Sequence, residues 1–298
     1  MRAPILVPVF LLSLSASASA CLWYYGKNIK GEKIELEEGR FPAKDFAKEL
    51  TSNPIHDEAL RVDPGPEPAA DADFKLRSDY AATLLHRGET KRGLAILEAV
   101  EKSHPGEYIV AANLGTAYEL SGDLEKAHHW IAEGMRRNPE SHDGSEWLHV
   151  RILEAKRELA RDPDWLKSHR LLEIDFGGDA VPRMPSTWGK HGEHETIQAI
   201  QYQLFERLAF VGPPEPLVGE LLGHYADWAA LKMSVEHAIS LYSLALAYHP
   251  VHSDLLAKRR KHALWIHESG MSGLVPGTGA VVAVILCLGL FVWPRKRA

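Results

Sequence analysis

The densest group of metal-ligating side chains lies between residues 191 and 195, where the sequence reads His191-Gly192-Glu193-His194-Glu195. Two histidines and a third ligand form a zinc site when a loop brings them to one ion. The spacing differs from the helical His-Glu-x-x-His of metallopeptidases. Glu193 and Glu195 also suit the first turn of a helix, because carboxylates complement the helix dipole there. His191 and His194 are thus weak metal candidates, and we favour a solvated loop that leads into a helix.

No other pattern in the sequence indicates catalysis. The chain contains neither Gly-x-Ser-x-Gly nor the phosphate-binding Gly-Lys-Ser/Thr. Its two cysteines, Cys21 and Cys287, cannot form a disulfide framework within one domain. We expect no enzymatic activity and no cofactor. The alternative is a metal-binding protein or hydrolase that uses the loop 176–194.

The N-terminal residues 1–20 have the composition of a signal peptide. Arg2 precedes the apolar stretch 5–14, and Ala18-Ser19-Ala20 is a small-x-small cleavage site. Cys21 would then begin the mature chain. A lipid on Cys21 is the alternative to a free cysteine, although Ala18 stands where bacterial lipoproteins prefer leucine.

The C-terminal residues 274–293 have the composition of a transmembrane helix. These twenty uncharged residues would span roughly 30 Å, about one hydrocarbon core. The basic tail 294–298 belongs on the cytoplasmic side. We therefore expect a single-pass protein of the inner membrane with its large domain outside the cytoplasm. The tail also resembles sorting signals that exosortase-type enzymes process, through residues 275–279, the apolar stretch and the basic cluster. Since the usual Pro-Glu-Pro is missing, we favour plain anchoring over cleavage.

The charge balance of the outer domain argues against nucleic acid as a partner. Without the two ends, 30 of the 34 basic residues remain against 40 acidic ones. Nucleic acid requires a basic face. One basic stretch, residues 258–262, precedes the predicted span, and we interpret it as an exposed helix face, with contact to anionic headgroups as the alternative.

Residues 71–141 hold two copies of a 34-residue pattern that must position any site. Aligning Pro105 with Pro139 matches every interval without a gap. The matched positions are Tyr80 with Leu114, Ala81 with Gly115, Leu84 with Tyr118, Gly88 with Gly122, Gly93 with Ala127, Leu97 with Ile131, and Val100 with Gly134. Each copy predicts two helices, over 73–86 and 90–103, then over 107–120 and 124–137, with turns at the paired glycines.

This pattern resembles the tetratricopeptide repeat, because a small residue beside an apolar one, an aromatic or leucine three positions on and a closing proline recur at 34 residues. The resemblance implies stacked helix pairs that bind a protein or peptide on a concave face. The signal, the repeats and the single span together resemble tetratricopeptide proteins of the bacterial envelope. The function implied is a membrane-anchored scaffold for protein–protein interaction, with an exosortase-processed surface component as an alternative.

Outside residues 71–141 the 34-residue repeat is first absent and then returns in a degenerate form, and this divides the rest of the chain into segments. Residues 21–70 form an irregular lead-in that ends in a proline-rich linker. Residues 142–218 hold divergent helices around a long loop, and residues 219–268 hold a degenerate third repeat followed by a capping helix. The expected fold class is therefore all-α, a tetratricopeptide-like α-solenoid with a divergent middle section plus one C-terminal transmembrane helix.

The resemblance also indicates where a partner would bind. Asn113 occupies an asparagine position with which some family members grip a C-terminal carboxylate. Its expected partners in the first repeat are Ser78 and Ala82, so that clamp is not present. We therefore expect Asn113 and Ser78 to contact a partner as general polar groups, with a structural role for Asn113 as the alternative.

Overall fold

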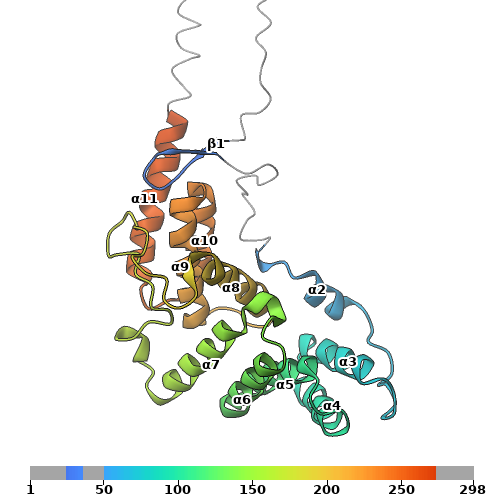
Figure 1. Cartoon of the computed structure of the whole chain (residues 1–298). Helices are drawn as coiled ribbons and strands as arrows, with labels where there is room; N and C mark the ends of the chain where they lie inside the picture. Colours follow the sequence, from blue (N-terminus) through green and yellow to red (C-terminus); the bar gives the residue numbers. More distant parts are fainter. Residues whose placement is uncertain (1–24, 36–49, 273–298) are drawn as a thin grey trace, which may run out of the picture.

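A computed structural model describes residues 25–35 and 50–272. The predicted signal peptide, Cys21, the predicted span 274–293 and the basic tail lie outside these residues. Ten α-helices and one short hairpin make up the described part, and each helix packs on its neighbour in chain order (Figure 1). The all-α prediction is therefore confirmed in its coarse form. Among the described helices, none combines the length and the apolar character needed to cross a bilayer.

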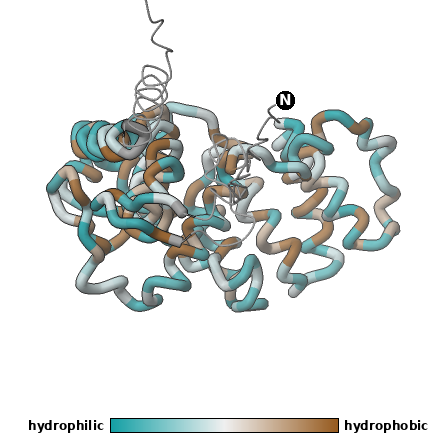
Figure 2. The backbone as a smooth tube through the Cα atoms, turned by 90° about the horizontal axis from the view of Figure 1, so that it is seen from above, coloured by the Kyte–Doolittle hydropathy of each residue, from teal (hydrophilic) through white to brown (hydrophobic). Residues whose placement is uncertain are grey.

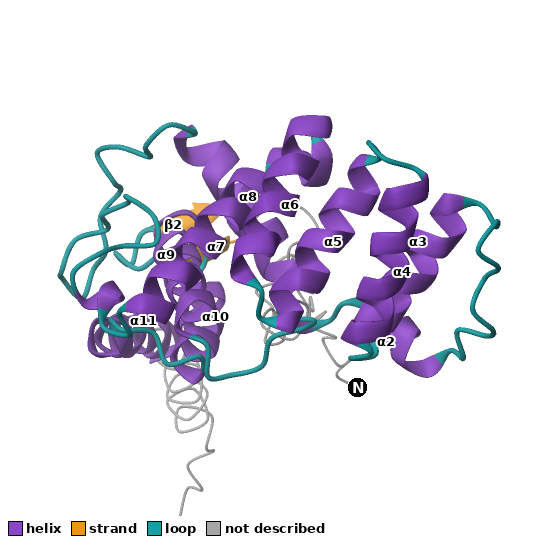
Figure 3. Cartoon of the chain, turned by 90° about the horizontal axis from the view of Figure 1, so that it is seen from below, coloured by secondary structure: helices purple, strands orange, loops and turns teal. Residues whose placement is uncertain are grey.

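The two sequence repeats fold into four consecutive helices. These are α3 (Phe74–His86), α4 (Thr90–Ser103), α5 (Tyr108–Ser121) and α6 (Leu124–Arg137). The limits of α4 and α6 coincide with the prediction. Asp73 caps α3 by accepting from Lys75 and Leu76, and Asp123 caps α6 by accepting from Lys126. Figure 3 shows these four helices side by side in one half of the molecule.

Small residues of the repeat allow its two helices to approach closely. A methyl group added to Gly115 would overlap the side chain of Ile131 and lie 3.0 Å from its backbone nitrogen. Gly134 of α6 also faces α5, but a methyl group added there would lie 3.4 Å from the backbone nitrogen of Ala112, at ordinary contact distance. The turn glycines Gly88 and Gly122 have φ of 76° and 86°, a region that favours glycine.

The second half of the chain contains five further helices. They are α7 (Glu146–Arg161), α8 (Gly192–Arg207), α9 (Pro216–Lys232), α10 (Val235–Ala247) and α11 (Ser253–Ser272). Helix α8 begins at Gly192, so Glu193 and Glu195 lie in its first turn as expected. The 3₁₀ turns η1 (Ser141–Gly144) and η2 (Trp165–Lys167) flank α7.

The long connection between η2 and α8 is held firmly against α11. Arg259 donates to the carbonyl oxygens of Phe176 and Asp179, at 3.2 and 3.1 Å, and to that of Gly177. Its guanidinium also pairs with Asp227 of α9, and the Arg259 side chain is only 2 % exposed. The interpretation of residues 258–262 as an exposed basic face is therefore wrong for Arg259, because this cation is used inside the fold.

The lead-in is less irregular than the sequence indicates. The strands β1 (Tyr25–Lys27) and β2 (Lys33–Glu35) form an antiparallel hairpin, and α2 (Pro54–Arg61) packs beside α3. At the hairpin tip, Ile29 is fully buried and its N–H donates to Ala230 at 2.9 Å. The hairpin and the end of α11 consequently lie at the same end of the molecule (Figure 1). A tight glycine turn at Gly31, with φ of 79°, supports this local order.

Two hydrophobic clusters form the core, and α7 contributes to both. Leu153 packs with the helices of the repeats, whereas Leu148 and Ile152 pack with α8 to α11 and the long connection. Figure 2 shows hydrophobic and hydrophilic stretches alternating along the chain, as expected for amphipathic helices. Helix α7 therefore joins the regular repeats to the divergent half.

Candidate functional site

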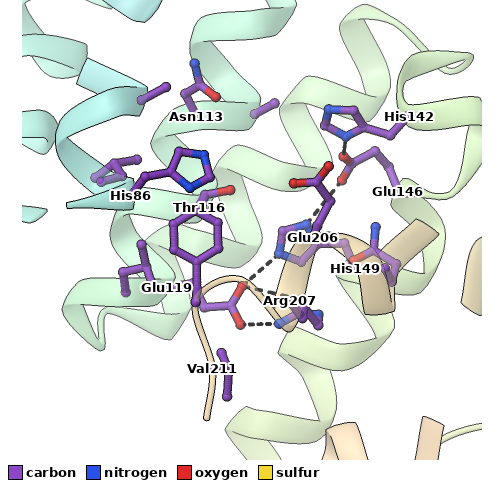
Figure 4. A pocket seen from close by; sticks show the side chains of 16 residues that line it. His86, Asn113, Thr116, Glu119, His142, Glu146, His149, Glu206, Arg207 and Val211 are labelled. Carbon is purple, nitrogen blue, oxygen red and sulfur yellow. Dashed lines mark hydrogen bonds and ion pairs between the residues drawn. The ribbon is translucent and has the colours of Figure 1, made fainter. Parts of the chain in front are cut away.

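A cavity of about 130 Å³ opens where the repeats meet the divergent half. Helices α3, α5, α7 and α8 contribute its walls, together with η1 and the connection after α8 (Figure 4). The lining residues are Ala82, Leu85, His86, Ala112, Asn113, Thr116, Glu119, Leu120, His142, Glu146, His149, Gln203, Glu206, Arg207, Phe210 and Val211. The cavity is thus built from helices that lie far apart in the sequence, and it combines charged, polar and apolar side chains.

The central charged group of the cavity is the carboxylate of Glu119 on α5. One of its oxygens accepts from Arg207 and from Lys156, at 2.7 and 2.8 Å, and the other lies 2.7 Å from His149 Nε2. Burial by itself would raise the pKa of Glu119, but Arg207, His149 and Lys156 together hold that pKa well below its ordinary value. Glu119 is therefore ionised and fully neutralised by its partners.

A second carboxylate, Glu146, lies between two histidines of the same chain segment. His142 Nδ1 bonds to Glu146 Oε1, and His149 Nδ1 lies 3.4 Å from Oε2. Burial opposes ionisation of Glu146, yet its interactions with His142 and His149 lower its pKa to about 2. Burial likewise opposes protonation of both histidines, and their bonds to carboxylates still raise their pKa values above the ordinary 6.5.

The backbone that carries His142 is strained. His142 and Asp143 have φ of 52° and 54°, and Gly144 follows with φ of 69°. Two adjacent non-glycine residues in this left-handed region cost on the order of 1–3 kcal/mol each. The turn nevertheless places the His142 ring at the rim of the cavity, where it stacks on Tyr202 with ring centroids 5.3 Å apart. Such strain is often found where a side chain has a functional position.

The third carboxylate of the cavity belongs to Glu206 of α8. No described residue forms a hydrogen bond or an ion pair with it, and Figure 4 shows its carboxylate directed into the cavity. Burial raises the pKa of Glu206, His142 lowers it, and the neighbouring Glu146 raises it further. Glu206 therefore offers unused hydrogen-bonding capacity to a ligand.

The opposite wall is apolar and aromatic. His86 stacks on Phe210 with centroids 4.5 Å apart, and its Nδ1 lies 3.1 Å from Nδ1 of His56 on α2. Burial, together with the nearby His56, lowers the pKa of His86 to about 4. His86 is consequently neutral at physiological pH, and this wall presents no cation to the cavity.

The two predicted partner-binding residues, Asn113 and Ser78, differ in their accessibility to a partner. Asn113 lies on the cavity wall, half-buried, and its amide nitrogen donates to Ser78 Oγ at 3.0 Å. Ser78 is fully buried, so its side chain is not accessible to a partner in this structure. A hydroxyl on the inner side of α3 is covered by α5 of the next repeat. Asn113 remains a candidate through its side-chain oxygen, to which no described residue donates.

The weak metal candidates do not form a metal site. His191 stacks on Trp147, with centroids 3.9 Å apart, and lies 3.7 Å from Glu195, while His194 is exposed. Across residues 25–35 and 50–272, no three histidine, cysteine or carboxylate side chains are placed to hold one ion. The loop 176–194 instead contributes Phe176 to the core. The metal and hydrolase alternative thus has no support from the described residues.

The charged residues of the cavity were not predicted from the sequence. The stripe of Leu148, Ile152, Ala155 and Leu159 identifies α7 as a packed helix, but it does not single out Glu146 and His149. Their spacing of three residues on a helix was the available signal, because such residues share one face. Glu119 and Arg207 are 88 positions apart, so no local pattern links them.

Comparison with known proteins identifies no relative: no protein-family model matches the chain, and no curated protein is significantly similar to it.

Proposed function

We propose that this chain is a tetratricopeptide-type docking protein, tethered to a membrane by residues 274–293, whose cavity receives a segment of a partner protein. The 34-residue period and the consecutive packing of α3 to α6 support the repeat assignment. The tether and the export signal rest on the composition of the two ends.

One observation carries the proposal. The cavity wall holds three polar side chains from two different helices, the amide oxygen of Asn113, the hydroxyl of Thr116 and the carboxylate of Glu206, and none of them accepts a hydrogen bond from a described residue. Buried or half-buried polar groups are normally paired within the protein or with water. Three such acceptors around one cavity can receive hydrogen bonds from a polar segment of another chain.

Binding suits this site better than catalysis. Partners hold the pKa values of Glu119 and Glu146 well below the ordinary 4.5, so neither carboxylate readily accepts a proton from a substrate. Repeat helices also present a large surface beside the cavity, on which the rest of a partner can lie.

Site-specific crosslinking in the native membrane tests the proposal. A photoreactive residue at Thr116, in the cavity wall, is expected to form an adduct with one defined partner. The same residue at Ala99, on the exposed side of α4, is the matched control and is expected to form none. Filling the cavity with Ala82→Phe should abolish the adduct at position 116 while the helix content stays unchanged. Equal adducts at both positions, or an adduct that survives Ala82→Phe, would contradict docking in the cavity.

A further inference from the structure

The unpartnered carboxylate of Glu206 specifies which kind of group enters the cavity. It projects between α5 on one side and α7 with η1 on the other (Figure 4). An ionised carboxylate in a half-buried site gains most from a cation that brings its own hydrogen-bond donors. Whether the protein itself supplies such a cation depends on the other charged groups around Glu206.

The charge balance around Glu206 depends on the protonation of His142 and His149. Carboxylates line the cavity at Glu119, Glu146 and Glu206, whereas the permanent cations are Arg207 and Lys156, both bonded to Glu119. His86 of α3 is neutral at physiological pH. The remaining titratable groups that face this region are His56 of α2, Asp143 of η1, His142 and His149, and Tyr202 of α8. When His142 and His149 are neutral, the cavity thus carries an excess of negative charge.

A second acceptor points to the same kind of ligand. The side chain of Glu146 is only 3 % exposed, and although Glu146 lines the cavity, its Oε2 accepts no hydrogen bond from a described residue. Its nearest cationic partner is His149 Nδ1 at 3.4 Å. A buried carboxylate oxygen without a donor is costly unless a ligand or water supplies one.

We propose that Glu206 recognises the cationic end of a lysine or arginine side chain presented by the partner segment. This inference rests on the proposed docking function and names the chemistry of its ligand. The methylene stem of such a side chain would lie along the apolar wall of Ala82, Leu85 and Phe210. Asn113 and Thr116 provide further acceptors for its N–H groups.

The proposal has a defined pH dependence. Protonated His142 and His149 supply the positive charge that the ligand would otherwise bring, so a cationic side chain binds better when both are neutral. The pKa values of both histidines are raised above 6.5. Binding should therefore strengthen as the pH rises through the raised pKa values of the two histidines.

Two ligands of equal shape but different charge provide the test. Full-length protein in detergent micelles is titrated with N-acetyl-arginine amide and with N-acetyl-citrulline amide, its uncharged analogue, by calorimetry or NMR. We expect the arginine compound to bind at least about tenfold more tightly at pH 8.5, with a smaller ratio at pH 6. Equal affinities, or no binding of the arginine compound, would overturn the proposal.

Two variants on the same helix locate the effect. Glu206→Gln keeps the size of the side chain and should abolish the preference for arginine over citrulline. Glu195→Gln, at a position 67 % exposed near the start of α8, is the matched control and should retain it. A preference that survives in Glu206→Gln would assign the recognition to another residue.

The two proposals fail in different ways. If the adduct at position 116 forms but is unchanged in Glu206→Gln, docking stands and the charge preference is wrong. If position 116 forms no adduct, or forms one that survives Ala82→Phe, the docking function itself is wrong. Both outcomes are read from one set of crosslinking samples.

Discussion

Asn113 of α5 donates a hydrogen bond of 3.0 Å to Ser78 of α3, and this bond links the first helices of the two repeats. The residues are 35 positions apart, one more than the repeat period, so they do not occupy equivalent places. Ser78 is fully buried, whereas Asn113 reaches the cavity wall. The bond therefore joins the packing of the repeats to the geometry of the proposed binding site.

Removing the serine hydroxyl should weaken the fold only modestly. Ser78→Ala takes away the acceptor, but the half-buried amide of Asn113 can turn to water, so we expect a loss of about 0.5–1.5 kcal/mol in the free energy of unfolding. Urea denaturation followed by circular dichroism measures it. Ser103→Ala, on the exposed face of α4, should change stability by less than about 0.5 kcal/mol. Equal losses in the two variants would argue against a special role for the bond.

A methyl group at Gly115 should separate the helices of the second repeat. It would overlap Cδ1 and Cγ1 of Ile131, and overpacking costs about 1–3 kcal/mol, partly offset by the better helix propensity of alanine. We expect Gly115→Ala to be destabilising by about 1–2 kcal/mol in urea denaturation.

Two further variants check that steric explanation. In an Ile131→Ala background the cost of Gly115→Ala should shrink, because the overlapping side-chain atoms are gone. Gly178→Ala, with no atom within 4 Å of the added group, should leave stability almost unchanged. An unaltered cost in the Ile131→Ala background would mean that the backbone contact dominates.

Replacing Arg259 should release the connection between η2 and α8. Arg259→Met leaves Asp227 buried without its cation and the carbonyl oxygens of Phe176 and Asp179 without a donor. Breaking a buried ion pair on one side costs about 3–5 kcal/mol. Thermal unfolding should shift accordingly, and limited proteolysis should cut within residues 168–191 first. Lys258→Met, at the adjacent exposed position, should do neither.

Acid should destabilise the protein through Glu146. Its folded-state pKa of about 2 lies below the ordinary 4.5, so its contribution is present above pH 4.5 and is lost as pH falls toward 2. The full shift corresponds to a loss on the order of 3 kcal/mol for this buried group. Denaturation midpoints measured from pH 6 to pH 3 should fall less steeply in Glu146→Gln than in the parent. Parallel slopes would assign the acid sensitivity to other carboxylates.

Base should weaken the same cluster through His142. Its folded-state pKa is raised above 6.5, so its contribution is full below pH 6.5 and is lost as pH rises through the folded-state value. His142→Gln should remove this alkaline loss. The His142 titration itself can be followed by NMR of the ring protons, and a value below 6.5 would contradict the bond to Glu146.

Local sequence signals determined the elements of this protein. The limits of α4 and α6 follow from amphipathic periodicity, the paired turn glycines and the closing prolines, all of which act over a few residues. The small residue at position 115 likewise follows from the repeat pattern. The hairpin at residues 25–35 could not be predicted in this way, because its order depends on Ile29 entering a core formed by distant helices.

Only the tertiary structure decided which charges meet. Glu119 and Arg207 lie 88 positions apart, and Arg259 stands among exposed lysines in a stretch that resembles a solvated face. Ser78 is a polar residue that the sequence suggests as a partner contact, but the next repeat covers it. Periodicity reports which side of a helix is apolar, whereas the partner of a buried ion depends on where other helices pass. The paths of those helices are set by packing over the whole domain, and short-range sequence patterns do not encode this packing.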